Sequence, residues 1–205
     1  MIVTRPRHVD IEAHEICHDG FFRLERFGLR HALFDGGMSP PLTRELFERG
    51  HAVAVLPYDP VHDAVVLIEQ FRIGALEREG GPWLLEIVAG VIDGDESPEA
   101  VARREVVEEA DLHLGRLEKI CRFYVSPGGT SESIHLYCGE VDSIGAGGIH
   151  GLDEEGEDIR VFAEPLDDAL ERLAAGEIDS ASPVIALQWL ALNRIRLRRE
   201  WADLG

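Results

Sequence analysis

Three glutamates at helical spacing are the residues of this sequence that most clearly point to chemistry. Glu105, Glu108 and Glu109 stand at positions i, i+3 and i+4, which share one face of an α-helix. Like charges at this spacing repel, and each pair destabilises a helix by about 0.2–0.5 kcal/mol. Carboxylates that converge on one point suit a hard divalent cation such as Mg²⁺ or Mn²⁺. The alternative is a surface helix that is acidic for no catalytic reason.

The flanking residues predict a strand, a turn and a helix that would hold these carboxylates. Leu84–Ile92 is apolar and β-branched except at Glu86, which is typical of a buried strand. Asp93-Gly94-Asp95 then marks a turn. Ser97 is a suitable N-cap and precedes a proline at the first helical position, so we expect a helix from about Pro98 to Ala110.

The remaining elements predict an α+β protein, an α/β/α sandwich around a mixed sheet. Residues 1–48 carry the turn signals Asp19-Gly20 and Asp35-Gly36-Gly37 and predict a small N-terminal layer of antiparallel strands. Residues 49–205 form the main domain, whereas the glycine-rich segment Gly145–Gly156 lacks periodicity. Within that domain we expect strands at residues 51–56, 64–70, 120–125, 133–141 and 159–162, and helices at 166–175 and from 182 to about 201.

Composition narrows the classes of partner. The chain has 205 residues and a formal net charge of −19, so we expect binding neither to nucleic acid nor to an anionic membrane. Cys17, Cys121 and Cys138 lack CxxC spacing, which disfavours a zinc site and a disulfide framework. No signal-peptide core and no run of about 18 apolar residues is present. We therefore expect a soluble cytoplasmic protein.

The stretch from Gly90 to Leu112 resembles the Nudix box, G-x5-E-x7-R-E-U-x-E-E-x-G-U, where U is aliphatic. Eight of its nine specified positions match, and Asp111 replaces a glycine. That position ends the helix, and Asp tolerates the left-handed conformation better than most residues, so we expect a small stability cost and no loss of activity. The matching residues are Gly90, Glu96, Arg104, Glu105, Val106, Glu108, Glu109 and Leu112.

Segments outside the box resemble the bacterial ADP-ribose pyrophosphatases of this family. These segments are Arg44–His51, Ser126–Glu132, Gly148–Gly151 with Glu154–Arg160, and Ser182–Leu190, and Pro127 lies fifteen residues past Leu112. The resemblance implies a homodimer, with the N-terminal layer as dimerisation element, that hydrolyses ADP-ribose to AMP and ribose 5-phosphate with Mg²⁺ or Mn²⁺. Two alternatives remain: hydrolysis of another nucleoside diphosphate derivative, such as a nucleotide sugar, and a non-catalytic module that senses ADP-ribose.

The same resemblance implies a role for each candidate residue. The metal ligands would be the Ala89 carbonyl and the carboxylates of Glu105, Glu109 and Glu157, with Glu108 close by. Glu155 would be the general base, and Arg104 would orient the box carboxylates. The substrate would be bound by Phe21 and Arg44 at the adenine end, Arg44 acting across the dimer interface, by Arg72 at phosphate and by Glu132 at a ribose. The residues alone also allow a plain core position for Phe21, a surface position for Arg72 and a solvated acidic loop at Glu154–Glu157.

Overall fold

The computed structural model of this protein describes residues 7–152 and 156–202. These residues divide into two compact units. The smaller unit holds the described residues through His51 together with Tyr124–Ser133. The larger unit holds Ala52–Phe123 and the described residues from Ile134 onward.

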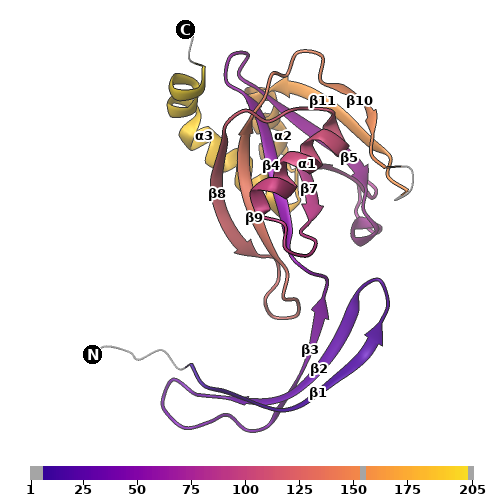
Figure 1. The fold of residues 1–205 in the computed structure, drawn as a ribbon, viewed down its shortest axis with the longest axis vertical. Helices are drawn as coiled ribbons and strands as arrows, with labels where there is room; N and C mark the ends of the chain where they lie inside the picture. Colours follow the sequence, from indigo (N-terminus) through magenta and orange to yellow (C-terminus); the bar gives the residue numbers. More distant parts are fainter. Residues whose placement is uncertain (1–6, 153–155, 203–205) are drawn as a thin grey trace. The chain divides into compact units, whose positions relative to one another are not determined.

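The larger unit is built on one mixed β-sheet in which β4 runs parallel to β9 and antiparallel to β5. The strand order is β10-β11-β5-β4-β9-β8 (Figure 1). In addition, β6 pairs with β5 and β7 pairs with β4. The strands are β4 (Ala52–Asp59), β5 (Ala64–Phe71), β6 (Trp83–Glu86), β7 (Val88–Val91), β8 (Leu117–Tyr124), β9 (Ser133–Glu140), β10 (Gly147–His150) and β11 (Ile159–Pro165).

Helices cover both faces of this sheet, because its central strands are apolar on both sides. Val53 and Val55 of β4 pack with the helix α1 (Pro98–Ala110), whereas Ala54 and Leu56 pack in a second core with α2 (Leu166–Ala175) and α3 (Ala181–Trp201). Strand alternation sends successive side chains to opposite faces. The expected α/β/α sandwich is therefore confirmed, and among the described residues no helix is both long and apolar enough to cross a membrane.

Helix α1 begins and ends where its sequence predicts. The Ser97 hydroxyl accepts a hydrogen bond from the backbone N–H of Ala100 at 3.2 Å, and Pro98 is the first helical residue. Asp111 adopts the left-handed conformation (φ 51°, ψ 39°), and its N–H donates to the carbonyl of Val107 at 3.0 Å. The residue that departs from the box pattern thus keeps the backbone geometry for which glycine is usually selected.

Two segments of the larger unit differ from the sequence expectation. The single strand expected at Leu84–Ile92 is divided at Ile87, because β6 pairs with β5 while β7 pairs with β4. The segment Gly145–Gly156, expected to be irregular, contains β10, which pairs with β11. Its first two residues, Gly147 and Gly148, have no side chains, so the alternation that normally reveals a strand is missing from the sequence.

The smaller unit contains a three-stranded antiparallel sheet in the order β1-β2-β3. Its strands are β1 (Val9–Asp19), β2 (Arg23–His31) and β3 (Leu42–Glu48), and every residue of β1 is exposed. The loop Ser126–Thr130 joins this unit, because the Phe47 N–H donates to the carbonyl of Gly129 at 2.8 Å.

Candidate active site

The glycine that opens the box lies directly beneath a box carboxylate. Gly90 of β7 pairs with Val53, which places it on the sheet face that α1 covers. A Cβ atom added at Gly90 would lie 2.0 Å from both Cδ and Oε1 of Glu105, far inside van der Waals contact. Any side chain at position 90 would therefore have to displace the Glu105 side chain from this position.

Glu109 is the most enclosed carboxylate of the box, with 3% of its surface exposed. Its Oε2 accepts a hydrogen bond from the backbone N–H of Ala89 at 3.0 Å, which places the box helix against β7. Burial raises the pKa of Glu109 to about 8; the Ala89 N–H opposes this rise, and the charges of Glu105 and Glu157 add to it. The side chain is thus a buried acid that lies among other acids.

Glu105 has the same kind of environment. Burial raises the pKa of Glu105 to about 7, Arg104 opposes the rise, and Glu108 and Glu157 add to it. Carboxylates that raise one another's pKa are stabilised as anions by a bound cation, and oxygen-only donors suit Mg²⁺ or Mn²⁺. The side chains of this cluster therefore fit a hard divalent cation.

Arg104 contacts three of the acids that surround it. Its Nη1 lies 2.8 Å from Oε1 of Glu105 and 2.8 Å from Oε2 of Glu108, and its Nη2 lies 3.5 Å from Oε2 of Glu96. The role expected for Arg104, which is to orient the box carboxylates, stays a prediction.

Two hydrogen bonds join Glu157 to Leu152. Its Oε2 accepts the N–H of Leu152 at 3.0 Å, and its own N–H donates to the Leu152 carbonyl at 3.2 Å. Gly151 has a φ of 103°, and a Cβ there would approach Cβ of Glu157 to 2.6 Å. Glu155, the expected general base, lies outside the described residues.

Arg72 is held by a residue that the sequence expectation for the site did not include. Its Nε donates to Oε2 of Glu86 at 2.7 Å, and the same oxygen accepts from Nε2 of Gln70 at 3.4 Å. The signal for Glu86 was present in the sequence, because it is the one charged residue in the apolar stretch Leu84–Ile92.

The other expected substrate-binding residues belong to the smaller unit. Phe21 is 95% exposed, so the alternative of a core position is wrong. Arg44 is exposed and donates to the Thr43 carbonyl at 2.8 Å. Glu132 is buried, and its Oε1 lies 3.5 Å from Nε of Arg49.

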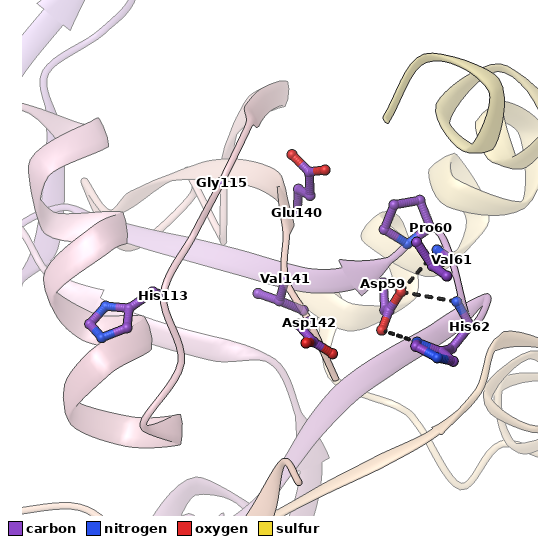
Figure 2. A pocket seen from close by; sticks show the side chains of 9 residues that line it. All are labelled: Asp59, Pro60, Val61, His62, His113, Gly115, Glu140, Val141 and Asp142. Atoms are coloured by element: carbon purple, nitrogen blue, oxygen red, sulfur yellow. Dashed lines mark hydrogen bonds and ion pairs between the residues drawn. The ribbon is translucent and has the colours of Figure 1, made fainter. Parts of the chain in front are cut away.

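A cavity of about 570 Å³ lies elsewhere in the larger unit, between the β4–β5 turn, the segment after α1 and the end of β9 (Figure 2). Oxygen and nitrogen atoms of Asp59, His62 and Asp142 there lie within 4.8 Å of one another. In the described part of the chain, no three box carboxylates have ligand atoms that lie so close together. Asp59, however, already accepts hydrogen bonds from the N–H groups of Val61 and His62, from His62 Nδ1, and from the N–H and hydroxyl of Ser143. Burial opposes ionisation of Asp59, but these bonds hold its pKa well below the usual range. Asp59 therefore fixes the turn.

The chain is similar to a known domain family and to several pyrophosphatases. The model of the NUDIX domain matches residues 48–202. The ADP-ribose pyrophosphatase of Escherichia coli (strain K12) is 52% identical over 194 residues, which cover 95% of this chain and 93% of that protein. The ADP-ribose pyrophosphatase of Haemophilus influenzae is 46% identical over 196 residues, covering 94% and 90%.

Two further similarities are more distant. The GDP-mannose pyrophosphatase of Cronobacter sakazakii is 37% identical over 187 residues, covering 88% of this chain and 96% of that protein. A crystal structure of an ADP compounds hydrolase superposes with a TM-score of 0.69 at 20% identity, covering 93% of this chain and 98% of that one. At that identity the structural match supports the fold alone.

Proposed function

The chain belongs to the Nudix family, and we propose that it hydrolyses the pyrophosphate bond of ADP-ribose to give AMP and ribose 5-phosphate. Two relatives, at 52% and 46% identity, are ADP-ribose pyrophosphatases. The observation that carries the proposal is the packing of Glu105 on Gly90 beside the buried Glu109, because this arrangement gathers oxygen donors that the packing of the fold does not require.

We propose Mg²⁺, or Mn²⁺, as the cation, held by the Ala89 carbonyl and by Glu105, Glu109 and Glu157. Such ions neutralise a pyrophosphate, polarise its phosphorus and lower the pKa of a bound water. Arg104 keeps the Glu105 and Glu108 carboxylates in place through its two 2.8 Å contacts. Arg72 would bind phosphate, which its positive charge favours in a chain of net charge −19.

The remaining roles rest on the resemblance of the sequence alone. Glu155 is proposed as the general base that takes a proton from the attacking water, a contribution of about 10²–10⁴-fold. Phe21 and Arg44 are proposed at the adenine end, and Glu132 at a ribose. We also propose a cytoplasmic homodimer formed through the N-terminal layer, with Arg44 supplied by the partner subunit.

A nucleotide sugar is the second candidate substrate, because the GDP-mannose pyrophosphatase of Cronobacter sakazakii is 37% identical. The lower identity ranks it behind ADP-ribose. The sensing alternative is weaker, since a module that only binds ADP-ribose leaves the cluster of Glu105, Glu108 and Glu109 unexplained.

The proposal is tested by kcat/KM with Mg²⁺ for ADP-ribose, GDP-mannose, a UDP-sugar, NADH and a diadenosine polyphosphate. We expect ADP-ribose to be favoured tenfold or more, with AMP as a product. A flat profile would reject the substrate while keeping pyrophosphate chemistry. Binding of ADP-ribose without turnover of any compound would favour the sensor.

A further inference from the structure

Glu86 is a carboxylate at the end of β6, in an otherwise apolar strand. Its Cα pairs with that of Ile68, whose side chain packs on the α1 side of the sheet, so Glu86 lies on the same face as the box helix. Its side chain is 16% exposed. Because burial of an unpaired carboxylate is unfavourable, its partners show what this residue does.

Those partners converge on one oxygen atom. Oε2 of Glu86 accepts Nε of Arg72 at 2.7 Å and Nε2 of Gln70 at 3.4 Å. The backbone of Arg72 is fixed as well, since its N–H donates to the Pro82 carbonyl at 2.8 Å. Arg72 is therefore held at its main chain and at Nε, which leaves little freedom for the guanidinium.

The guanidinium is bonded to a carboxylate on the sheet face that α1 covers. The positive charge of Arg72 acts to lower the pKa of Glu109, which requires the two groups to be near each other. In the described part of the chain no hydrogen bond occupies Nη1 or Nη2 of Arg72, whose side chain is 42% exposed. These two nitrogens form the planar fork that binds phosphate in a bidentate manner.

We propose that Glu86 is a positioning residue for the reaction: it holds Arg72 by Nε so that Nη1 and Nη2 bind a phosphate of the substrate. The inference rests on the proposed function for the phosphate-bearing substrate, but it does not depend on which nucleoside diphosphate derivative is hydrolysed. Glu86 acts only through Arg72.

A double-mutant cycle tests this relation. We expect Glu86→Ala to raise KM about tenfold or more with a smaller change in kcat, because a phosphate interaction that is equally strong in the ground state and the transition state affects mainly KM. Arg72→Ala should have an effect at least as large. The double variant should lie within about twofold of Arg72→Ala, since Glu86 has no role once Arg72 is absent.

Two further variants distinguish the positioning of Arg72 from the charge of Glu86 and from a general loss of structure. Glu86→Gln keeps a carbonyl oxygen that can accept Nε, so its KM should remain within about threefold of wild type. Glu69→Ala is the matched control: Glu69 makes a similar 2.7 Å contact to Nε of Arg160, but its Cα pairs with that of Leu85, on the opposite face. It should leave KM unchanged.

The assay uses whichever of ADP-ribose and GDP-mannose the wild type hydrolyses faster, and the cycle is repeated with Kd for ADP-ribose. If ADP-ribose is not hydrolysed, the proposed function is rejected. The double-mutant cycle, measured with GDP-mannose or by Kd for ADP-ribose, then still tests the role of Glu86. Multiplicative losses in the double variant would overturn the inference, and so would a Gln variant as impaired as the Ala variant. Melting temperatures of all variants check that each is folded.

Discussion

At the scale of single residues, Gly90 and Glu105 depend on one another. The position of the Glu105 carboxylate is possible only because residue 90 has no Cβ, since that atom would lie 2.0 Å from Cδ of Glu105. The φ of Gly90 is not in the left-handed region, so the requirement for glycine arises from space and not from backbone conformation.

Gly90→Ala should therefore reduce activity much more than stability. The added methyl group must displace the Glu105 side chain, and misplacement of a catalytic group by about 1 Å can reduce the rate about 10²-fold. Steady-state kinetics and the melting temperature would separate the two effects. Gly74→Ala is the control, since nothing lies within 4 Å of its Cβ and its φ is ordinary. A Gly90→Ala variant with full activity would show that Glu105 need not lie there.

Glu109→Gln should abolish turnover while the fold remains intact. The substitution keeps the shape of the side chain and removes a carboxyl group that could bind a cation as an anion; burial raises the pKa of this group to about 8. We expect kcat/KM to fall at least about 10³-fold, and Mg²⁺ to stop raising the melting temperature, because a ligand stabilises only the state that binds it. Glu171→Gln, at an exposed position of α2, is the control. Unchanged Mg²⁺-dependent activity would refute the metal assignment.

Sequence reasoning found the box residues because their chemistry depends on spacing along one helix, and local spacing is visible in a sequence. The contact of Glu86 with Arg72 is not visible in this way, because it joins residues 14 positions apart, one at the end of β6 and the other directly after β5. The strand register that brings them together is decided by tertiary packing. Glu86 was noticeable only as a charge within an apolar stretch.

At the scale of elements, helix α1 ends on a residue that is not the best for its conformation. Asp111 has a φ of 51°, and a non-glycine residue in this region carries a steric cost. Its N–H and that of Leu112 donate to the carbonyls of Val107 and Val106, so the helix end is well hydrogen-bonded. The only cost left at this helix end is therefore the backbone strain of a non-glycine residue.

Asp111→Gly should consequently stabilise the protein by about 0.5–1 kcal/mol and leave kcat/KM unchanged. The gain is smaller than the steric cost, because glycine also increases the entropy of the unfolded chain. Chemical denaturation would measure the difference. Destabilisation would mean that the Asp111 carboxylate contributes an interaction that outweighs the strain.

Asp63 joins the β4–β5 hairpin to α3 by accepting hydrogen bonds from the Tyr58 hydroxyl at 2.7 Å and from Arg194 and Arg198. Burial opposes its ionisation, but the Arg194 and Tyr58 hydrogen bonds outweigh burial and lower the pKa of Asp63. A lowered pKa means that the unfolded state takes up the proton first as the pH falls. The ionised Asp63 carboxylate therefore stabilises the folded state fully above its pKa in the unfolded chain, about 3.9, and this stabilisation is lost in more acid solution.

Asp63→Asn should remove about 2 kcal/mol near pH 7, because the hydrogen bonds to a charged acceptor become bonds to a neutral one. Asparagine tolerates the φ of 56° found at this position, so backbone strain is not introduced. The gap in melting temperature between wild type and variant should shrink as the pH is lowered toward 3. A gap that does not change with pH would mean that the carboxylate charge is not the cause.

Helix boundaries were predictable at this scale, whereas two strands were not. Ser97, Pro98 and Asp111 mark the ends of α1 through their own backbone chemistry, which acts locally. The division of the 84–92 stretch at Ile87 depends on which neighbouring strands are free to pair. The first two residues of β10 are glycines, so this strand cannot show alternation in the sequence. Both depend on the partner strand.

At the scale of the whole molecule, none of the described residues of the smaller unit belongs to either cluster of buried apolar side chains. An isolated three-stranded sheet is marginal in water unless one of its faces is covered. Every residue of β1 is exposed, including Val9, Ile11 and Ile16 at 54%, 63% and 49%. No local pattern in residues 124–133 reveals that they pack with this sheet, so the sequence could not place them there.

The exposed apolar residues of β1 lead to the last prediction, that wild-type protein is a homodimer and that Ile11→Glu shifts it toward monomer. Covering apolar surface contributes about 25 cal/mol per Å², and a glutamate at position 11 would bring a charge into that interface. Sedimentation velocity at micromolar concentration measures the assembly. Ile195→Glu is the matched control, because Ile195 is 86% exposed on α3 and its replacement should leave a dimer intact. A monomeric wild type would reject the dimer, and a dimeric Ile11→Glu variant would show that the interface does not include β1.

Arg44 is proposed to act across this interface. Loss of the dimer in the Ile11→Glu variant should therefore also raise KM for ADP-ribose, whereas KM should be unchanged in the Ile195→Glu variant, which remains a dimer.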